Sequence, residues 1–446
     1  MHIPQLQRVC LCILTVLVCM SCSACLCQAR PTKAQAGMVV DAEAIRASVA
    51  MGEAYLEAAV KEDGSFVYLY DPETQQEVDD YNVVRHAGTV WSMARALRYL
   101  DTSSDGSPAL AWHERADAMH RAADKMLDWM VPCVPGIDTA LCMRNSKWVS
   151  KLGGNALALL ALSEIGLLHL ESPHLSDTTS VQYGVAHYTP YMHGLAAGIL
   201  GCMDGQGGWD HHNFDCRKGT TKSGKCSFFA GEAALALCRY HSYSGDTDAL
   251  EGAREAVTRI VADQDAALEA SREKKEAEGV TPKYTMDHWV CIAMSYLNGV
   301  EPLPSYLTDH LREQAVLMQR GQRTSGRYLG GYQKPPAVCS SATRFEALVG
   351  AYSVLCADQT HTAGSAALCT GIRQTLARGS HFLVSSQYPA PRSVHTESTL
   401  VGALPPQDGQ AFSAVGGWPS KQNDRQIRID NVQHSMCALM GMAVLA

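Results

Sequence analysis

Residues that commonly carry acid–base chemistry recur at the start of several apolar segments in this sequence of 446 residues. His86 follows Arg85 in the first of these segments, and Asp430 precedes His434 by four residues in the last. A spacing of four places Asp430 and His434 on one side of a helix. Imidazole and carboxyl groups are the side chains that most often transfer protons in enzymes. Their recurrence at equivalent helix ends predicts that they meet in one site.

Three histidines are candidates for proton transfer because each lies near the start of such a segment: His86, His288 and His434. The positive end of a helix dipole disfavours further positive charge, so it would keep an imidazole neutral near pH 7. The alternative is that each histidine makes a structural hydrogen bond to a neighbouring helix. The sequence lacks His-x-x-x-His spacing, so we expect no metal site, and we expect no cofactor.

Carboxyl groups at the same helix ends form a second set of candidates: Glu232, Asp287, Glu346 and Asp430. Glycoside hydrolysis usually needs one carboxylic acid with a raised pKa and one carboxylate base or nucleophile, about 5 to 10 Å apart. Helices that face one another could supply such a pair. The alternative is that these carboxylates form salt bridges between helices, because buried charges are normally paired.

The elements that must position these residues are six helices that begin with polar residues and continue with small apolar ones. They are predicted near 82–100, 151–168, 228–244, 285–298, 341–356 and 428–445. A helix that is apolar on nearly all sides is a buried helix. Amphipathic stretches at 41–61, 108–130, 246–272 and 303–320, together with 185–203 and 363–385, lie between them. The alternation of solvent-facing and buried helices predicts six helical hairpins.

This alternation resembles the six-hairpin (α/α)6-barrel superfamily, which includes glycoside hydrolases, polysaccharide lyases and sugar epimerases. The resemblance covers 41–446 and rests on architecture, since no single motif identifies one family. It implies an all-α fold, a toroid of six helical hairpins in one domain, with its cleft at the end where the inner helices begin. The polar residues of this sequence gather at the predicted starts of those helices.

A carbohydrate ligand is what this resemblance implies, and several residues near the helix starts and in the long loops are predicted to bind it. They are Asn82, Arg85, Asn155, Trp209, Asp210, Arg344, Tyr332 and Arg428. Trp209 and Asp210 belong to a glycine-rich loop that could close over a ligand. The aromatic side chains could supply flat faces for sugar rings, or they could fill the mouth of the barrel.

The first 29 residues are predicted to be an export signal, followed by a linker at 30–40 and the barrel domain at 41–446. Arg8 precedes an apolar run at 9–20, and small residues follow that run. Ser23, Ala24 and Cys25 fit the end of a bacterial lipoprotein signal, while plain secretion and an uncleaved anchor are the alternatives. Each alternative places the domain in the periplasm or cell envelope, with membrane contact only through the N-terminus.

Composition and cysteine spacing add two expectations. The formal net charge of −8 and the lack of a basic patch give no indication of nucleic-acid binding. Export permits disulfides, and the loop cysteines are predicted to pair as Cys133 with Cys142 and Cys216 with Cys226. Cys238, Cys291 and Cys437 lie on apolar helices and are expected to be buried free thiols, while Cys202, Cys339, Cys356 and Cys369 remain unassigned.

Three functions follow from the resemblance and the candidate residues. The first is hydrolysis of a glycosidic bond by carboxylates, in a uronic-acid-containing or other cell-envelope glycan. The second is epimerisation or β-elimination, in which His86, His288 or His434 takes a proton and Arg85 or Arg428 neutralises the developing enolate. The third is a non-catalytic glycan-binding or scaffold protein.

Overall fold

Twelve helices and eight short strands make up the part of the chain that the structure describes. The computed structural model describes residues 42–101, 109–133, 137–171, 185–224, 226–278, 287–357, 363–388, 412–421 and 424–445. The predicted signal at 1–29 and the linker at 30–40 lie outside these residues. The helices belong to one unit, Val40–Ala446.

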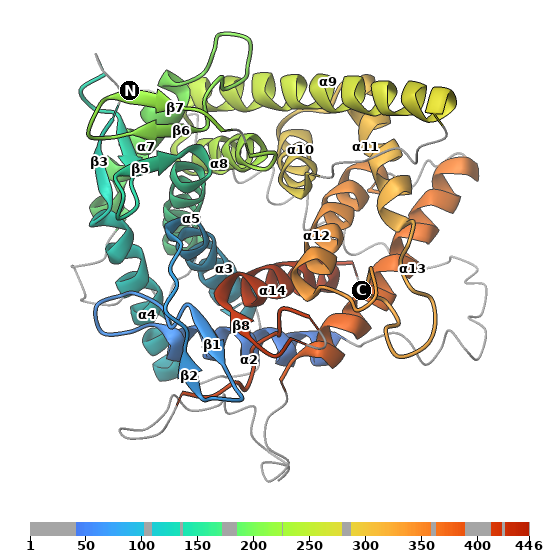
Figure 1. The fold of residues 1–446 in the computed structure, drawn as a ribbon, viewed down its shortest axis with the longest axis horizontal. Coiled ribbons are helices and arrows are strands. Elements are labelled where there is room, and N and C mark those ends of the chain that lie inside the picture. Colours follow the sequence, from blue (N-terminus) through green and yellow to red (C-terminus); the bar gives the residue numbers. More distant parts are fainter. Residues whose placement is uncertain are drawn as a thin grey trace, which may run out of the picture. The chain divides into compact units, whose positions relative to one another are not determined.

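Six of the helices form a closed inner ring (Figure 1): α3 (Val83–Asp101), α5 (Leu152–Glu171), α8 (Phe229–Ser244), α10 (His288–Val300), α12 (Val338–Leu355) and α14 (Ile429–Ala443). Each packs against the next along the chain, and α14 packs against α3 to close the ring. The (α/α)6 toroid and all six predicted inner helices are therefore confirmed. The inner helices are buried, as expected for helices that are apolar on nearly all sides. In α5, every residue from Leu152 to Leu168 is buried.

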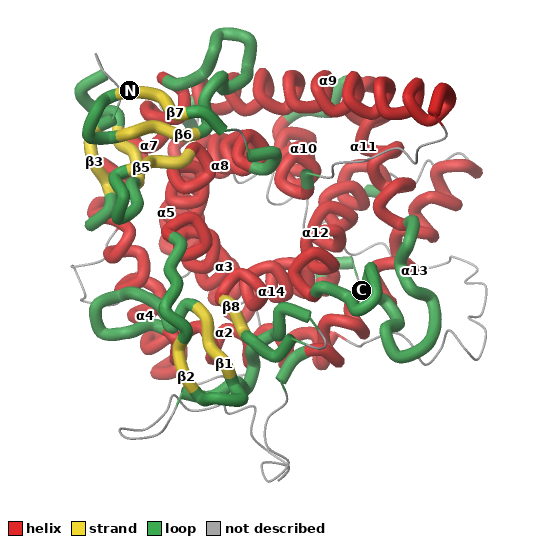
Figure 2. The backbone as a smooth tube through the Cα atoms, in the orientation of Figure 1, coloured by secondary structure: helices red, strands yellow, loops and turns green. Residues whose placement is uncertain are grey.

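Six outer helices surround this ring (Figure 2): α2 (Ala42–Ala59), α4 (Ala109–Leu127), α7 (Val185–Gly201), α9 (Thr247–Glu278), α11 (Ser305–Gln319) and α13 (Ala363–Ser386). Each packs an apolar face against the inner ring, and all of them except α7 turn charged residues to solvent. Among the described helices, only α5 is long and apolar enough to cross a membrane. Its apolar window is 94% buried, as expected of a core helix.

Short antiparallel strands hold the starts of neighbouring inner helices at one end of the ring. β5 (Val149–Lys151) leads directly into α5 and pairs with β6 (Asn213–Asp215), which pairs with β7 (Thr220–Lys222) in the connection to α8. β8 (Ile427–Arg428) leads into α14 and pairs with β1 (Leu69–Asp71) in the connection to α3. We call this end of the ring, where the inner helices begin, the near end. The half of the ring toward the C-terminal ends of the inner helices is called the far half.

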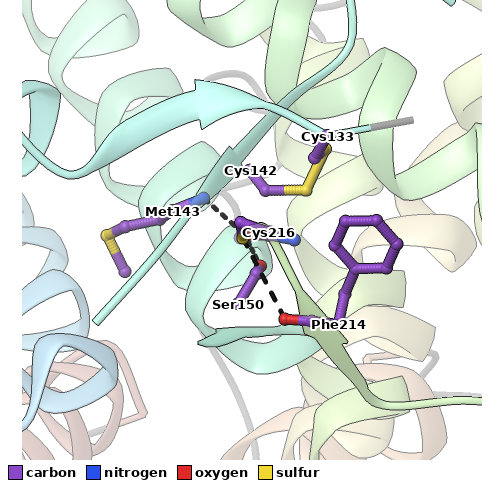
Figure 3. Close-up of a disulfide and its surroundings, with 7 residues drawn as sticks. Cys133, Cys142, Met143, Ser150, Phe214 and Cys216 are labelled. Carbon is purple, nitrogen blue, oxygen red and sulfur yellow. Dashed lines mark hydrogen bonds between the residues drawn. A yellow bond between two sulfur atoms is a disulfide. The ribbon is translucent and has the colours of Figure 1, made fainter. Parts of the chain in front are cut away.

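β1 also pairs with β2 (Gln76–Glu77) across a turn that begins at Asp71 and Pro72, which forms a hairpin before α3. A further hairpin, β3 (Met130–Pro132) with β4 (Leu141–Met143), follows α4. The predicted Cys133–Cys142 disulfide joins the ends of these two strands (Figure 3). A second disulfide, Cys356–Cys369, links the end of α12 to α13 and uses two of the unassigned cysteines.

The predicted pairing of Cys216 with Cys226 is wrong, since both thiols are free; Cys216 is drawn in Figure 3. Backbone pairing of β6 with β7 already closes this loop. The Cys216 N–H donates to the Trp148 carbonyl, and the Cys226 N–H donates to His212 Nδ1, so each cysteine is held by a different partner. The three helical cysteines are buried free thiols, as expected: Cys238, Cys291 and Cys437.

Candidate active site

Three of the predicted catalytic residues meet at the near end, each from a different inner helix. His434 of α14 hydrogen-bonds through Nδ1 to Glu346 Oε2 of α12, at 3.0 Å. His288 Nε2, at the start of α10, lies 3.5 Å from the same carboxylate oxygen. The two imidazole rings are 5.3 Å apart, centre to centre. One carboxylate therefore touches two histidines that lie near enough to act on one small molecule.

The surroundings give these two histidines opposite charge preferences. Burial alone would lower the pKa of His434, but the charge of Glu346 and the hydrogen bond to it raise this pKa above its usual value. Burial lowers the pKa of His288 well below its usual value, and the charge of His434 lowers it further. Neither ring nitrogen of His288 has a hydrogen-bond partner in the described part of the chain. His434 therefore favours its protonated form more than an ordinary histidine does, and His288 favours its neutral form.

Local sequence explains how the two imidazoles are held. Asp287 is the N-cap of α10 and accepts a hydrogen bond from the Trp289 N–H at 3.0 Å, so His288 is the first helical residue. The Trp289 indole contacts both imidazoles, with ring centres 4.5 Å from His288 and 5.9 Å from His434. Trp91 of α3 packs behind Trp289 at 5.4 Å. Sequence reasoning missed both tryptophans, although each lies on a predicted inner helix.

Two arginines converge on Asp430 beside this cluster. Arg85 Nε donates to Asp430 Oδ2 at 2.8 Å, and Arg428 donates to Oδ1 at 2.5 Å and to Oδ2 at 2.9 Å. Arg85 also donates to the Tyr68 hydroxyl, a partner that sequence reasoning missed. Burial alone would raise the pKa of Asp430, but the hydrogen bond and charge of Arg428, with the charge of Arg85, hold it below its usual value. Asp430 is therefore an anion that orients two guanidinium groups.

A second pair of predicted catalytic residues, Glu232 and Asp287, lies between the starts of α8 and α10. Both are buried, and neither forms an ion pair in the described part of the chain. Burial, aided by the charge of Asp287, raises the pKa of Glu232 well above its usual value. Burial raises the pKa of Asp287 to about 8, against hydrogen bonds from the backbone of Trp289 and Val290. These two carboxyl groups therefore favour their protonated forms.

His86 lies at the start of α3 but does not join the cluster. Its Nδ1 hydrogen-bonds to the Tyr81 hydroxyl at 2.7 Å, and its Nε2 lies 2.8 Å from the Ala122 carbonyl oxygen. The side chain is fully buried, and burial lowers its pKa to about 4. These contacts support the structural alternative for His86. Asn82 accepts the Val84 N–H at 2.9 Å and so acts at the same helix end as a cap.

The remaining predicted binding residues lie apart from the cluster or serve the core. Asn155 accepts hydrogen bonds from the Met143 N–H and the Ser150 hydroxyl in the buried start of α5. The Trp209 indole is buried and donates to the Ile199 carbonyl, while Asp210 beside it is exposed.

Tyr332 is also buried, and its hydroxyl donates to the Met318 carbonyl. The Arg344 guanidinium lies over the Tyr332 ring, 4.4 Å from its centre. The structure thus brings Arg85, Arg428 and Asp430 beside the His288–Glu346–His434 cluster, and places the aromatic candidates elsewhere.

The same cluster is also the one group in the described part of the chain with a donor set for a metal ion. One ligand atom each from His288, Glu346 and His434 lies within 4.8 Å of the others. Two imidazoles and a carboxylate are ligands that zinc and iron accept. The expectation of no metal was drawn from spacing along a single helix, and these three residues come from three helices. That expectation remains a prediction.

Comparisons with known proteins agree with this architecture. No protein-family model and no curated protein matches the sequence. Among solved structures, a D-mannose isomerase is similar with a TM-score of 0.58 and 12% identity, over 90% of this chain and 97% of that one. The GH76A α-1,6-mannanase from Salegentibacter sp. HEL1_6 is similar with a TM-score of 0.54 and 10% identity, over 90% of this chain and 100% of that one. The cellobiose 2-epimerase from Bacillus thermoamylovorans B4167 is similar with a TM-score of 0.51 and 12% identity, over 86% of this chain and 95% of that one. At these identities the likeness shows the (α/α)6-barrel fold.

Proposed function

We propose that this protein is a carbohydrate-active enzyme that moves a proton at the carbon next to a carbonyl or carboxylate group of a sugar, as an epimerase or isomerase. The observation that carries this proposal is the contact of two imidazoles with one carboxylate. His288 Nε2 and His434 Nδ1 lie 3.5 and 3.0 Å from Glu346 Oε2, and the surroundings shift the pKa values of the two rings in opposite directions. Proton transfer at such a carbon needs one group that accepts a proton and one that donates it. The fold is shared with a mannose isomerase and a cellobiose epimerase, which supports the choice of a sugar.

In the proposed reaction, neutral His288 takes the proton from the carbon. The electrons of the C–H bond form a carbon–carbon double bond, and the carbonyl electrons move to oxygen. Protonated His434, whose Nδ1 is held by Glu346, then gives its Nε2 proton to the same carbon from the opposite face, and the carbon–oxygen double bond re-forms to give the epimer. In an isomerase the proton is instead given to the adjacent carbon, and a second proton passes between the two oxygens. The reaction leaves His288 protonated and His434 neutral, and proton exchange with water resets the two rings. Glu346 lies 3.5 Å from His288 Nε2 and 3.0 Å from His434 Nδ1, and it therefore stabilises the imidazolium whichever ring holds the proton.

Glycosidic hydrolysis is the second candidate function. The raised pKa of Glu232 is what a general acid needs, and the similar mannanase is named for cleavage of an α-1,6-mannan. Hydrolysis also needs an ionised carboxylate as base or nucleophile. The pKa of the neighbouring Asp287 is raised like that of Glu232, Asp430 is bound by two arginines, and Glu346 lies against His288 and His434. The histidines therefore fit the roles of acid and base better than the carboxyl groups do.

Export to the periplasm or cell envelope, with a lipid at Cys25 as one form of anchor, is part of the same proposal. The two disulfides support it, because disulfides persist in oxidising compartments. A glycan or sugar of the envelope is then the substrate within reach, and no nucleic-acid partner is proposed.

The test is incubation in D2O with a panel of neutral and uronic sugars and oligosaccharides. Three signals are followed together: deuterium at carbon by NMR, new reducing ends, and absorbance of unsaturated products. We expect deuterium incorporation without cleavage, lost in His288→Asn and His434→Asn and retained in His211→Asn, whose side chain is exposed in the β6 connection. New reducing ends alone would favour hydrolysis, absorbance would favour elimination, and binding without any reaction would favour a scaffold.

A further inference from the structure

Two arginines share one carboxylate beside the proposed catalytic histidines. Arg85 and Arg428 both pair with Asp430. Glu346 lies against His288 and His434 instead. The described part of the chain shows no second carboxylate paired with either arginine.

Helix dipoles add to the positive electrostatic potential around Arg85 and Arg428. Arg428 is the N-cap of α14, and Arg85 is the third residue of α3. The N-terminus of a helix carries a partial positive charge, so acidic side chains are favourable there and cations are not. The acidic residues before α3, Asp79 and Asp80, line a separate hollow with Tyr81. Two cations at two positive helix ends are therefore offset by the single carboxylate Asp430.

The unused hydrogen-bond donors of both arginines are accessible. Arg85 uses Nε and Nη1, and Arg428 uses Nε and Nη2, which leaves Arg85 Nη2 and Arg428 Nη1 without a partner in the described residues. The side chains of Arg85 and Arg428 are 36% and 32% exposed, whereas that of Asp430 is 9% exposed. The carboxylate thus lies beneath the two guanidinium groups, and their free N–H groups face solvent.

This pair lies beside the proposed catalytic histidines. The charges of Arg85 and Asp430 both act on His434, in opposite directions. The Cys339 thiol at the start of α12 is within electrostatic reach of Arg85, Arg428, Asp430 and Glu346 together. A sugar held at the histidines would therefore have one end near the guanidinium groups.

We propose that Arg85 and Arg428 bind an acid group of the substrate, and that the substrate class is a sugar carrying one anionic group, with the carboxylate of a uronic acid as the first candidate. A guanidinium presents parallel N–H donors that match the oxygens of a carboxylate or phosphate, which a lysine ammonium does not. Asp430 orients the two guanidinium groups and neutralises only one of their two positive charges. The inference rests on the proposed function only for the choice of a sugar as ligand.

The test is calorimetric binding of D-glucuronate, D-glucose 6-phosphate and D-glucose to the whole protein, at low salt and at high salt. We expect the better of the two acidic sugars to bind at least about tenfold more tightly than glucose, with the preference reduced by salt. Arg428→Gln should abolish the preference, Arg428→Lys should keep a weakened one, and Arg425→Gln should match the unmodified protein. Arg425 is a suitable control because its side chain is 67% exposed and pairs only with Glu73 in the described part of the chain.

Tighter binding of glucuronate identifies a carboxylate, and tighter binding of the phosphate identifies a phosphorylated sugar. Equal binding of acidic and neutral sugars, or a preference that survives Arg428→Gln, would overturn the proposal. If Arg428→Gln does not fold, the salt dependence and Arg428→Lys decide the question. A preference without deuterium exchange would reject the proposed reaction alone, and exchange without a preference would reject this inference alone.

Discussion

The buried carboxyl group of Glu164, in the far half of the ring, differs sharply from those of Glu232 and Asp287 at the near end. Glu164 of α5, in the far half, accepts two hydrogen bonds from Arg239, at 2.8 and 3.0 Å, and pairs with Arg98 at 2.6 Å. Burial alone would raise its pKa, but Arg239, Arg98 and Arg95 hold it below the usual value.

Glu232 and Asp287 at the near end are buried to a similar degree, and each has a raised pKa. The difference is the presence of a cation, because burial disfavours the charged form in all three carboxyl groups. Glu164 is therefore held as an anion by surrounding arginines, as in a structural network. Glu232 and Asp287 have no cation beside them in the described part of the chain, and shifted pKa values of this kind are common in sites that bind and react.

The largest change in stability is expected from Glu164→Gln. The substitution leaves Arg239 and Arg98 facing a neutral amide in the buried far half. Removing one partner of a buried ion pair destabilises a protein by about 3 to 5 kcal/mol. Chemical denaturation would measure this loss. Asp263→Asn, in an exposed pair with Arg259, should change stability by less than about 1 kcal/mol. Equal effects of the two substitutions would remove the distinction between the two regions.

The next largest effect is expected from Asp287→Asn, which should change how the stability of the folded protein depends on pH. Burial raises the pKa of Asp287 to about 8 in the folded protein, whereas its ordinary value is 3.8. The folded state therefore binds more protons across that window, and stability falls as pH rises through it. Asparagine removes this dependence while keeping an oxygen for the Trp289 N–H.

We expect the variant to be more stable than the unmodified protein at pH 8 by on the order of 2 kcal/mol, and to gain less at pH 5. Denaturation curves at several pH values would measure this difference. Parallel pH profiles for the two proteins would show that Asp287 is already ionised in the folded state.

How much of this molecule follows from sequence depends on whether a feature is local. Helix boundaries are local: the helix predicted at 82–100 is Val83–Asp101, and the one at 428–445 is Ile429–Ala443. The partners of a side chain are not local. His434 bonds to Glu346, 88 residues away, and His86 is sealed by the Ala122 carbonyl of an outer helix. Sequence could therefore place the candidates at one end of the ring, but it could not separate a reactive histidine from a structural one.

A smaller effect is expected from filling the space beside Glu232. A Cβ at Gly153 would lie 2.1 Å from Glu232 Oε2 and 2.3 Å from the Phe229 ring. Gly153→Ala should therefore lower stability by about 1 to 3 kcal/mol. Gly299→Ala is the matched control, because it lies in α10 with no atom near the added Cβ, and it should stabilise by up to about 1 kcal/mol. Melting temperatures would compare them, and equal shifts would mean that the carboxyl group at Glu232 is not tightly held.

The central claim is that the surroundings shift the pKa values of His288 and His434 in opposite directions in the folded protein. The most direct test is an NMR titration of protein labelled with 15N-histidine, with His288→Asn and His434→Asn used to assign the two rings. We predict that the His434 ring titrates above the ordinary histidine pKa and that the His288 ring titrates below it. Two rings that titrate together at the ordinary pKa would contradict the assignment of an acid and a base at the near end.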